Sequence, residues 1–446
     1  MKLLPLLPLL LVMTTVLVSG CNDVSQSEKR LVIKDSLQVG FIWPAHPVGF
    51  AMITESPHQY IAYYDSNRVM TVAHRELGSD NWEKRRLNEK IGWDTHNYIA
   101  MALDSKGYLH ISGNMHVDTL VYFQSADPYD IQSLERVHAL TGEQEDRVTY
   151  PEFFEGPRGD LIFTYRDGGS GRGNQIYNRY DPGTGKWKRL IDEPLVDGQG
   201  EMNAYLHGPV LGPDDYYHLI WVWRDTPDAA TNHDISYAKS RDLVHWQKSD
   251  GSDQPLPITI DNGEIIDAVP AGGGMLNGNT VIGFDHQDRP VVTYHKFDAE
   301  GRTQVYNARR EENGWQIYQA TGWDFRWDFG GRGSINNRVG VYPVQPEGDQ
   351  LVQRFWIDTV GVQRYALDKS DLKAVEQLRA DHTYPAYLDG VRADHPEMRV
   401  NMVTDKIDGE EYYLLRWESL NRNRDRPREA PVPAARPLEL YHVVKE

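Results

Sequence analysis

Polar residues of this chain fall into pairs that are nearly symmetric about a turn. The pairs are His96 with His116, Tyr150 with Arg166, Asn203 with Arg224, and Asn277 with Lys296. If each turn joins the two strands of a hairpin, both members of a pair lie at its open end, and neighbouring hairpins bring the pairs to one mouth. An arginine there can grip a carboxylate with two hydrogen bonds, and a nearby tyrosine can exchange protons with the adjacent carbon or a leaving oxygen.

The elements that must position these residues are hairpins that recur along the chain. Their turns fall near residues 57, 106, 158, 214, 287, 347 and 407, each between runs of alternating apolar and aromatic residues. An interval of about 49 to 73 residues suits one four-stranded sheet per repeat. The sequence therefore predicts an all-β, seven-bladed β-propeller that forms a single domain over residues 41–446.

The net charge of the chain limits the classes of ligand that it can bind. The formal net charge of −18 argues against binding to nucleic acid, because such binding needs a basic face. An acidic polymer would have to be held by a local cluster of Arg, Lys or His, which the predicted mouth offers. We expect a monomer.

The first residues read as an export signal. Lys2 precedes an apolar run, and Leu17-Val-Ser-Gly-Cys21 is typical of a bacterial lipoprotein signal. We expect a signal peptide over residues 1–20, lipidation of Cys21 and a tether over residues 21–40, which places the protein at the cell envelope, with the outer membrane favoured, or secreted. The alternative is a transmembrane anchor, for which the apolar run is short. Cys21 is the only cysteine, so disulfides and thiolate metal sites are excluded.

Two histidines on one hairpin are the first candidate site. His110 lies within a strand, whereas His96 and His116 end the strand pair and can point into the mouth. The alternatives are a structural role and a zinc site, for which His207 or His233 could supply the third ligand.

The next hairpin carries Tyr150 and Arg166, followed by a glycine-rich loop. The glycines at 168, 169, 171 and 173 allow close approach of a bulky ligand. A structural ion pair of Arg166 with Asp167 or Asp225 is the alternative, and a phosphate-binding loop is disfavoured because neither a helix pattern nor a P-loop lysine follows. The corner Asn232-His-Asp234 could orient His233, or simply cap a blade edge.

These runs carry a resemblance to a known family. His96-Asn-Tyr-Ile99, Gly113-Asn-Met-His116, Tyr165-Arg-Asp-Gly-Gly-Ser-Gly171 and Thr231-Asn-His-Asp234 resemble the BNR-repeat propeller family that contains the ulvan lyases of polysaccharide lyase families 24 and 25. The resemblance implies a seven-bladed propeller that acts on ulvan, a sulfated rhamnose–uronate polymer, by β-elimination at a 4-linked uronate. Some relatives hold a structural zinc with cysteines and histidines, and this chain lacks those cysteines.

The resemblance implies a catalytic set of His96, His116, Tyr150 and Arg166. Arg166 with His116 would hold the uronate carboxylate, and Tyr150 with His96 would transfer the protons, with either residue as base. A cationic Arg166 would favour the phenolate form of Tyr150. No cofactor is required for this chemistry, and the sequence leaves room for a structural metal ion.

Six further residues are expected to contact the substrate, and Arg172 among them is expected to meet a sulfate: Asn97, Arg172, Tyr205, His207, Arg224 and His233. Two other classes of function stay open. A sialidase-like glycoside hydrolase would need a pair of carboxylates or an arginine triad with a nucleophile, and a surface glycan-binding lipoprotein would need no catalytic group.

Overall fold

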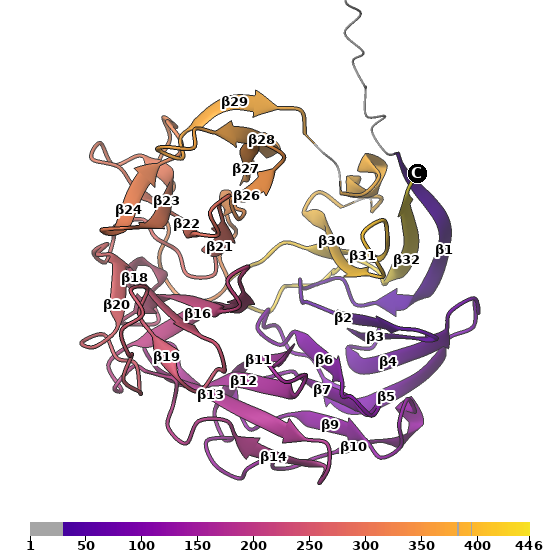
Figure 1. Ribbon diagram of the computed structural model, residues 1–446. Helices are drawn as coiled ribbons and strands as arrows, with labels where there is room; N and C mark the ends of the chain where they lie inside the picture. The colour runs from indigo at the N-terminus through magenta and orange to yellow at the C-terminus, as the bar shows by residue number, and fades with distance from the viewer. Residues whose placement is uncertain (1–29, 381–382, 394) are drawn as a thin grey trace, which may run out of the picture.

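Seven antiparallel sheets form a ring around a central axis (Figure 1). The computed structural model describes residues 30–446 except 381, 382 and 394. The signal peptide and residues 21–29 of the predicted tether, Cys21 included, lie outside these residues. Each sheet is one blade, and the blades are numbered below in chain order. Seven sheets confirm the prediction of an all-β, seven-bladed propeller.

The first three blades contain the strands that carry His116 and Tyr150, and His96 lies in the connection between the first two of them. Blade 1 consists of β2 (Ala51–Glu55), β3 (His58–Tyr64), β4 (Val69–Glu76) and β5 (Glu83–Lys90). Blade 2 consists of β6 (Ile99–Leu103), β7 (Leu109–Gly113), β9 (Tyr122–Ser125) and β10 (Leu134–Arg136). Blade 3 consists of β8 (His116–Asp118), β11 (Val148–Glu155), β12 (Leu161–Gly169), β13 (Arg172–Asp181), β14 (Lys186–Arg189) and β15 (Val196–Asp197).

The next three blades follow the same plan. Blade 4 consists of β16 (Asn203–Leu211), β17 (Tyr217–Arg224), β18 (Asn232–Ser240), β19 (Trp246–Gln247) and β20 (Glu264–Asp267). Blade 5 consists of β21 (Val281–Phe284), β22 (Pro290–Phe297), β23 (Thr303–Glu311) and β24 (Gly314–Gln319). Blade 6 consists of β25 (Val339–Val341), β26 (Gln345–Glu347), β27 (Gln350–Ile357), β28 (Gly361–Leu367) and β29 (Ala374–Leu378).

Blade 7 closes the ring by joining the two ends of the chain. It consists of β30 (Met398–Lys406), β31 (Glu411–Leu420), β32 (Arg436–Lys445) and, from the N-terminal side, β1 (Leu31–Ile42). β1 pairs with β32 from Leu31 opposite Lys445 to Ile42 opposite Arg436. The predicted tether over residues 21–40 is therefore wrong from Leu31 onward, because this segment satisfies its backbone hydrogen bonds as the outer strand of a blade.

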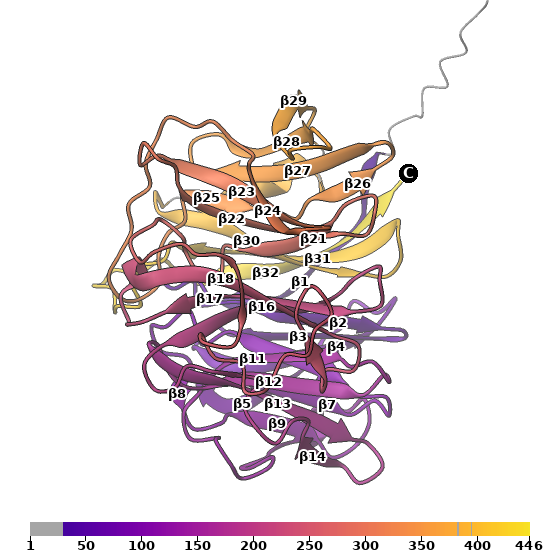
Figure 2. The same ribbon diagram turned by 60° about the vertical axis from the view of Figure 1, so that its left-hand side comes forward.

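The seven predicted turns are the turns of the innermost hairpins. Each joins two consecutive strands of a blade that pair with one another, as at Gly156–Asp160 between β11 and β12, and in blade 6 these strands are β26 and β27. The first strands of the blades surround the axis in Figure 1, and Figure 2 shows the blades stacked side by side. The open ends of these hairpins therefore collect at one mouth.

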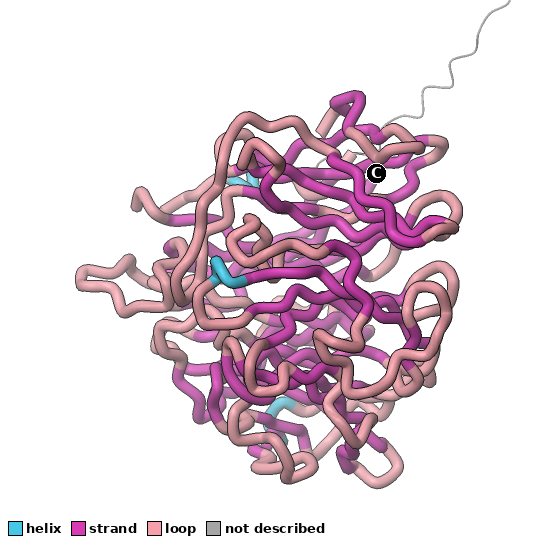
Figure 3. The backbone as a smooth tube through the Cα atoms, turned by 90° about the vertical axis from the view of Figure 1, so that its left-hand side faces the viewer, coloured by secondary structure: helices cyan, strands magenta, loops and turns pink. Residues whose placement is uncertain are grey.

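The blades pack through buried aromatic and aliphatic side chains. Trp221, Trp223, Tyr165 and Phe163 are among the largest fully buried side chains. Three short 3-10 helices, η1 (Ile131–Ser133), η2 (Ala229–Thr231) and η3 (Ala386–Asp389), lie in the connections (Figure 3). Within residues 30–380, 383–393 and 395–446, no helix has the length and apolar character needed to cross a membrane.

Candidate functional site

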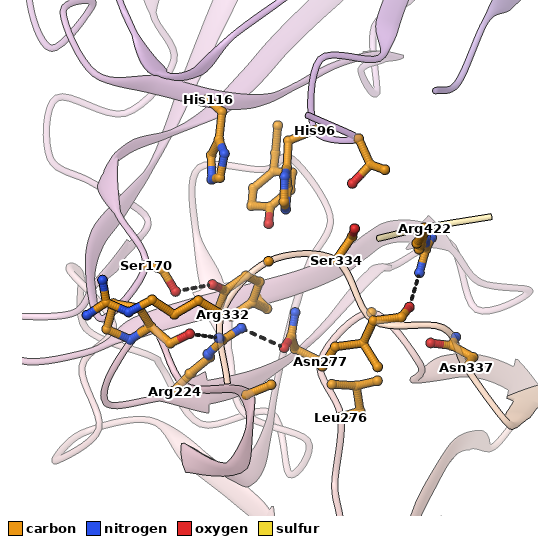
Figure 4. A pocket seen from close by; sticks show the side chains of 18 of the residues that line it. His96, His116, Ser170, Arg224, Leu276, Asn277, Arg332, Ser334, Asn337 and Arg422 are labelled. Atoms are coloured by element: carbon orange, nitrogen blue, oxygen red, sulfur yellow. Dashed lines mark hydrogen bonds between the residues drawn. The ribbon is translucent and has the colours of Figure 1, made fainter. Parts of the chain in front are cut away.

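A cavity of about 480 Å³ lies at the mouth where the hairpins open (Figure 4). The connection into blade 2 and segments of blades 3 and 4 form one side. The connections after blades 4 and 5 and the loop between β31 and β32 form the other. The residues that line it are Thr95, His96, Tyr98, His116, Tyr150, Ser170, Tyr205, Arg224, Pro227, Ala229, Leu276, Asn277, Gly278, Arg332, Gly333, Ser334, Ile335, Asn337 and Arg422. Five of the eight residues in the predicted pairs are among them.

His96 and His116 stack on one another at the cavity wall. Their ring centroids are 4.0 Å apart with an interplanar angle of 24°. Asp94 bridges the two rings: its Oδ1 lies 2.5 Å from Nδ1 of His96 and its Oδ2 lies 2.6 Å from Nδ1 of His116. The same Oδ1 accepts a hydrogen bond from the backbone N–H of His96 at 2.9 Å. Aspartate favours this kind of turn, in which its side chain accepts a hydrogen bond from the backbone N–H two residues later. The pair is therefore held by one carboxylate.

The carboxylate of Asp94 fixes the tautomer of both imidazoles. Burial alone would raise the pKa of Asp94, but the hydrogen bonds from His116 and His96 outweigh it and hold this pKa far below its usual range. An ionised carboxylate can only accept hydrogen bonds, so both Nδ1 atoms carry the proton that they donate. Nε2 of each ring is then the nitrogen available to a ligand in the cavity.

Tyr150 lies beside the histidines in a strained backbone conformation. Its φ is 58°, which is unusual for a bulky residue, and the pairing of β11 with β12 is irregular between Thr149 and Glu152. This bulge turns the ring toward His96, at 5.5 Å between centroids in an edge-on arrangement. Backbone strain of this kind persists where the surroundings enforce it, and it clusters at functional sites.

The phenol of Tyr150 is protonated in the resting protein. Burial and the neighbouring Tyr205 raise its pKa above the ordinary value of about 10, and the charges of Arg166 and Arg224 only partly oppose this rise. Arg166 does favour the phenolate, as expected, but the phenol stays protonated because the cost of burying a charged ring exceeds the attraction of the guanidinium.

Arg166 lies behind Tyr150 and does not line the cavity. The residue is 1 % exposed, and its guanidinium carbon lies 4.8 Å from the centre of the Tyr150 ring. Nη2 donates to Oγ1 of Thr149 at 3.1 Å. Gly173 makes room for it, because a Cβ there would come within 2.8 Å of the Arg166 side chain. The prediction that Arg166 binds a substrate carboxylate is therefore wrong. The guanidinium of Arg166 packs against the ring of Tyr150 instead.

Arg224 reaches the cavity that Arg166 does not. Its guanidinium lies 5.5 Å from the centre of the Tyr205 ring, and Nη1 donates to Oδ1 of Asn277 at 3.4 Å. Nε donates to the backbone oxygens of Thr226 and Asp228, which hold the guanidinium in place. The hydroxyl of Tyr205 bonds with that of Ser170 at 2.7 Å (Figure 4). The predicted contacts Tyr205 and Arg224 thus both face the cavity.

Asp425 ties together three loops at the cavity. Its Oδ1 accepts hydrogen bonds from the backbone N–H and the hydroxyl of Thr95, and its Oδ2 accepts the backbone N–H of Ser334 at 2.7 Å. Asp425 has a positive φ of 55°. The loop that carries Ser334 also presents Arg332, and the loop that carries Asp425 also presents Arg422. A single carboxylate therefore fixes the spacing between the histidine side and the arginine side.

Four predicted substrate contacts lie off the cavity. Asn97 donates to Asn114 at 3.3 Å, and Arg172 lies at the exposed tip between β12 and β13. His207 lines a separate hollow near the axis, where burial lowers its pKa. His233 bonds with Asp225 at 2.8 Å and Asp234 at 2.9 Å, so the alternative of a blade-edge cap is the better description.

Two more members of the predicted pairs, Asn203 and Lys296, also do not line the cavity. Asn203 is buried opposite Arg224, as the pairing predicts. Lys296 forms an ion pair of 2.5 Å with Asp267. The symmetric spacing therefore locates the mouth correctly, while neighbouring carboxylates and the close packing of the blades decide which side chains reach it.

The bridged histidines could also hold a divalent cation. Asp94, His96 and His116 each offer one ligand atom, and these atoms lie within 4.8 Å of one another. Imidazole and carboxylate ligands of this kind suit zinc. Neither predicted third ligand, His207 or His233, belongs to this group.

The sequence analysis missed several residues of the site. Asp94 could have been found from its place two residues before His96, because an aspartate side chain often accepts a hydrogen bond from the backbone N–H two residues later. Arg422 belongs to a run in which Arg422, Arg424, Arg426 and Arg428 alternate with other residues, a basic run that is unusual in an acidic chain. Arg332 lies between two glycines and carries no comparable signal.

Comparison with known proteins supports the same family. The family model for BNR repeat-containing proteins matches residues 58–323. The short isoform of ulvan lyase from Alteromonas sp. (strain LOR) is 28% identical over 156 residues, which are 32% of this chain and only 28% of that protein's length.

Two solved structures share the fold over nearly the whole chain. The crystal structure of polysaccharide lyase Uly1 has a TM-score of 0.63 at 13% identity and covers 93% of this chain and 99% of its own. The structure of a PL25 ulvan lyase bound to -[GlcA(1-4)Rha3S]- has a TM-score of 0.57 at 14% identity and covers 87% and 93%. With the family model matching more than half of the sequence, this chain belongs to the BNR repeat-containing family.

Proposed function

We propose that this protein is a polysaccharide lyase that cleaves a sulfated rhamnose–uronate polymer of the ulvan class by β-elimination at a 4-linked uronate. The similarity to an ulvan lyase in sequence and to a PL25 ulvan lyase in fold supports this class of substrate. The proposal depends on the site itself, since a fold alone does not define an activity.

The charge of the cavity is the observation that carries the proposal. Arg224, Arg332 and Arg422 line it together with two histidines, and none of its described lining residues is an aspartate or glutamate. This occurs in a chain with 65 acidic and 47 basic residues. The lining therefore argues against a glycosidase that uses two carboxylates at the scissile bond, and its arginines suit a lyase that binds an acidic sugar.

The uronate carboxylate is best met by Arg224 with Asn277. Both line the cavity, and the hydrogen bond between them at 3.4 Å keeps their polar atoms adjacent. A cationic donor at the carboxylate stabilises the charge that spreads onto it when the proton on C5 is removed. Arg224 thus binds the uronate carboxylate in this proposal, the role that the sequence suggested for Arg166.

Proton transfer is best assigned to His96 and Tyr150. Nε2 of His96 accepts the proton from C5, the C–H electron pair forms the C4=C5 bond, and the bond from C4 to its oxygen breaks. Tyr150, which is protonated at rest, donates its proton to the leaving oxygen. Its raised pKa favours the role of acid over that of base. Asp94 stabilises the imidazolium that forms on His96.

The cellular setting follows from the first residues of the chain. We propose export with a lipid anchor on Cys21, which would place the lyase at the bacterial cell envelope as a monomer. Radiolabelled palmitate in the protein from cells that express it, and its loss in Cys21→Ala, would support this setting. Unlabelled protein would contradict it.

The activity is tested by mixing the purified protein with ulvan. Elimination creates an unsaturated uronyl end that absorbs at about 235 nm, whereas hydrolysis and simple binding create no such group. The expected result is a steady rise in absorbance together with new reducing ends. Reducing ends without absorbance would indicate a hydrolase, and binding without either signal would indicate a glycan-binding protein.

A further inference from the structure

The two ends of each blade differ, because one end carries the hairpin turn and the other opens into the mouth. In blade 7 the hairpin turn lies between Lys406 and Glu411. β31 runs from this turn to Leu420, and the loop that follows it brings Arg422 to the cavity. The face of the propeller that carries the seven hairpin turns is called the turn face below, and it lies opposite the mouth.

The N-terminal strand enters blade 7 at the turn face. Arg30 and Glu446 exchange two backbone hydrogen bonds, of 2.6 and 2.8 Å. The next residue along β32, Lys445, donates its backbone N–H to the oxygen of Glu410 in the hairpin turn at 2.9 Å. From there β1 runs toward the mouth, antiparallel to β32. Figure 1 shows β1 and the C-terminus together at the outer rim of the ring, so the chain enters the propeller at the rim of the turn face.

The distance from this entry point to the proposed lipid anchor is limited. Residues 22–29 separate Cys21 from Arg30, and a chain of this length spans at most about 30 Å when it is fully extended. β31 alone, with 10 residues, rises about 30 Å from the turn face toward the mouth. In Figure 2 the C-terminus lies at one end of the blades, and the yellow loop that follows β31 projects from the other. Bringing the mouth to a bilayer would therefore need a fully stretched tether, which costs conformational entropy.

The hairpin turn of blade 7 presents an aliphatic side chain beside the entry point. Ile407 is 44 % exposed, and Lys406 and Lys445 next to it are exposed as well. An aliphatic side chain can enter the boundary between head groups and acyl chains, while lysines extend to the head-group phosphates. Asp408 and Glu446 balance the positive charge, so contact here does not depend on a net attraction to anionic lipid.

We infer that the protein docks on a lipid bilayer through the turn face at blade 7 and holds the mouth of the cavity open to the solution. The inference rests on the proposed anchor at Cys21 and adds to it the orientation of the propeller. A polymer that is too large to pass between the protein and the bilayer then reaches the cavity from the solvent. The orientation does not depend on the chemistry in the cavity, so docking and lyase function can fail independently.

The test uses two matched variants of the lipidated full chain in vesicles. Ile407→Cys lies in the hairpin turn of blade 7, and Val432→Cys lies in the loop at the mouth end of the same blade. Both replace an aliphatic residue of similar exposure, 44 % and 37 %, and Val432 does not line the cavity. With Cys21 blocked by its lipid, the introduced thiol is the only one that can react with a fluorescent maleimide. The vesicles contain phosphatidylethanolamine, phosphatidylglycerol and a small fraction of lipid with a nitroxide quencher on its head group.

The expected result is a difference in quenching between the two ends of the blade. We expect quenching at position 407 to be at least about threefold stronger than at position 432, because the two positions lie about 30 Å apart along the blade. Equal quenching on vesicle-bound protein, or stronger quenching at position 432, would overturn the docking. Labelled Cys21→Ala protein should neither float with the vesicles nor be quenched. If the parent chain also fails to float, the anchor and the docking are both wrong.

A longer tether tests the cause of the orientation. An insert of about thirty glycine and serine residues between residues 25 and 26 gives a flexible chain that reaches about 34 Å on average, farther than the height of β31. The difference in quenching between positions 407 and 432 should then fall below about half of its original size. A difference that persists unchanged would contradict the tether as its cause. None of these measurements uses turnover, so absent absorbance at about 235 nm in the parent would contradict the lyase function alone.

Discussion

Two of the groups of histidine and aspartate in this propeller, one at the cavity and one in blade 4, differ in how many imidazole nitrogens are bound to carboxylates. At the cavity, Asp94 takes Nδ1 of both His96 and His116 and leaves two Nε2 atoms for a ligand. At the edge of blade 4, Asp225 and Asp234 take both nitrogens of His233. The first cluster has one carboxylate for two rings, and the second has two carboxylates for one ring.

This difference indicates that the cavity cluster can take part in catalysis, whereas the cluster in blade 4 has a structural role. An imidazole with both nitrogens bound to carboxylates is held as a cation and has no lone pair to offer. Although burial lowers the pKa of His233, Asp234 and Asp225 together raise it above its ordinary value. At the cavity the single carboxylate instead binds Nδ1 of each ring, and Nε2 of each ring has no carboxylate partner. The sequence places both clusters at hairpin ends, so only the count of partners tells them apart.

Removing one imidazole from each cluster gives the largest expected contrast. His96→Ala should lower kcat/KM on ulvan by about a hundredfold or more, because it removes the proposed base. His233→Ala should change kcat/KM by less than about threefold, because His233 does not face the cavity. Initial rates of absorbance at about 235 nm measure both. Comparable losses in the two variants would remove the distinction between the clusters.

Neutralising one carboxylate in each cluster gives a smaller contrast. Asp94→Asn keeps the shape but offers a single acceptor oxygen, so one imidazole loses the partner that fixes its tautomer. We expect kcat to fall about tenfold, with KM little changed, as when a group that orients a reactive histidine is removed. Asp234→Asn should leave kcat unchanged, since asparagine also tolerates the positive φ of 43° at this position.

Nuclear magnetic resonance of nitrogen-15 histidine reports the tautomers directly. Asp94→Asn should move one cavity histidine from the Nδ1–H form to a mixture, and Asp234→Asn should leave both cavity histidines unchanged. Retention of both Nδ1–H tautomers in Asp94→Asn would show that Asp94 does not position the rings.

The smallest expected effect is on stability and depends on pH. Because the pKa of His233 is raised in the folded protein, its contribution is fully present below the unfolded value of about 6.5 and is lost as pH rises through the folded value. The Tm of His233→Gln should therefore fall below that of the parent by about 2 °C in mildly acidic buffer and by less in alkaline buffer. Thermal scans at several pH values check this, and a gap that widens with pH would contradict the assignment.

The repeated hairpins could be predicted because period and turn residues repeat in every blade. The pairing of Asn203 with Arg224 follows the predicted symmetry residue for residue. Tyr150 departs from it, since Arg166 pairs with Thr149 and the bulge leaves Tyr150 outside the regular register. A bulge of one residue cannot be read from a pattern of alternation, yet here it decides which side chain faces the cavity.

The side of the cavity formed by loops could not be predicted in this way. Arg332 and Arg422 lie on connections whose positions depend on Asp425, and a hydrogen bond from Ser334 across more than ninety residues of chain leaves no local pattern. The pairing of β1 with β32 is equally non-local, which is why local patterns do not predict a strand at residues 31–40. The repeat of hairpin turns along the sequence predicts the blades, whereas contacts between distant residues form the rest of the site.

The most direct test of the central claim compares the parent protein with Tyr150→Phe on ulvan at matched concentrations. Phenylalanine keeps the ring that packs over Arg166 and removes only the hydroxyl, so Tm should stay within about 2 °C of the parent. The account predicts that the parent releases product absorbing at about 235 nm and that Tyr150→Phe does so about a hundredfold more slowly. Near-normal release by Tyr150→Phe would contradict the assignment of Tyr150 as the acid of a β-elimination.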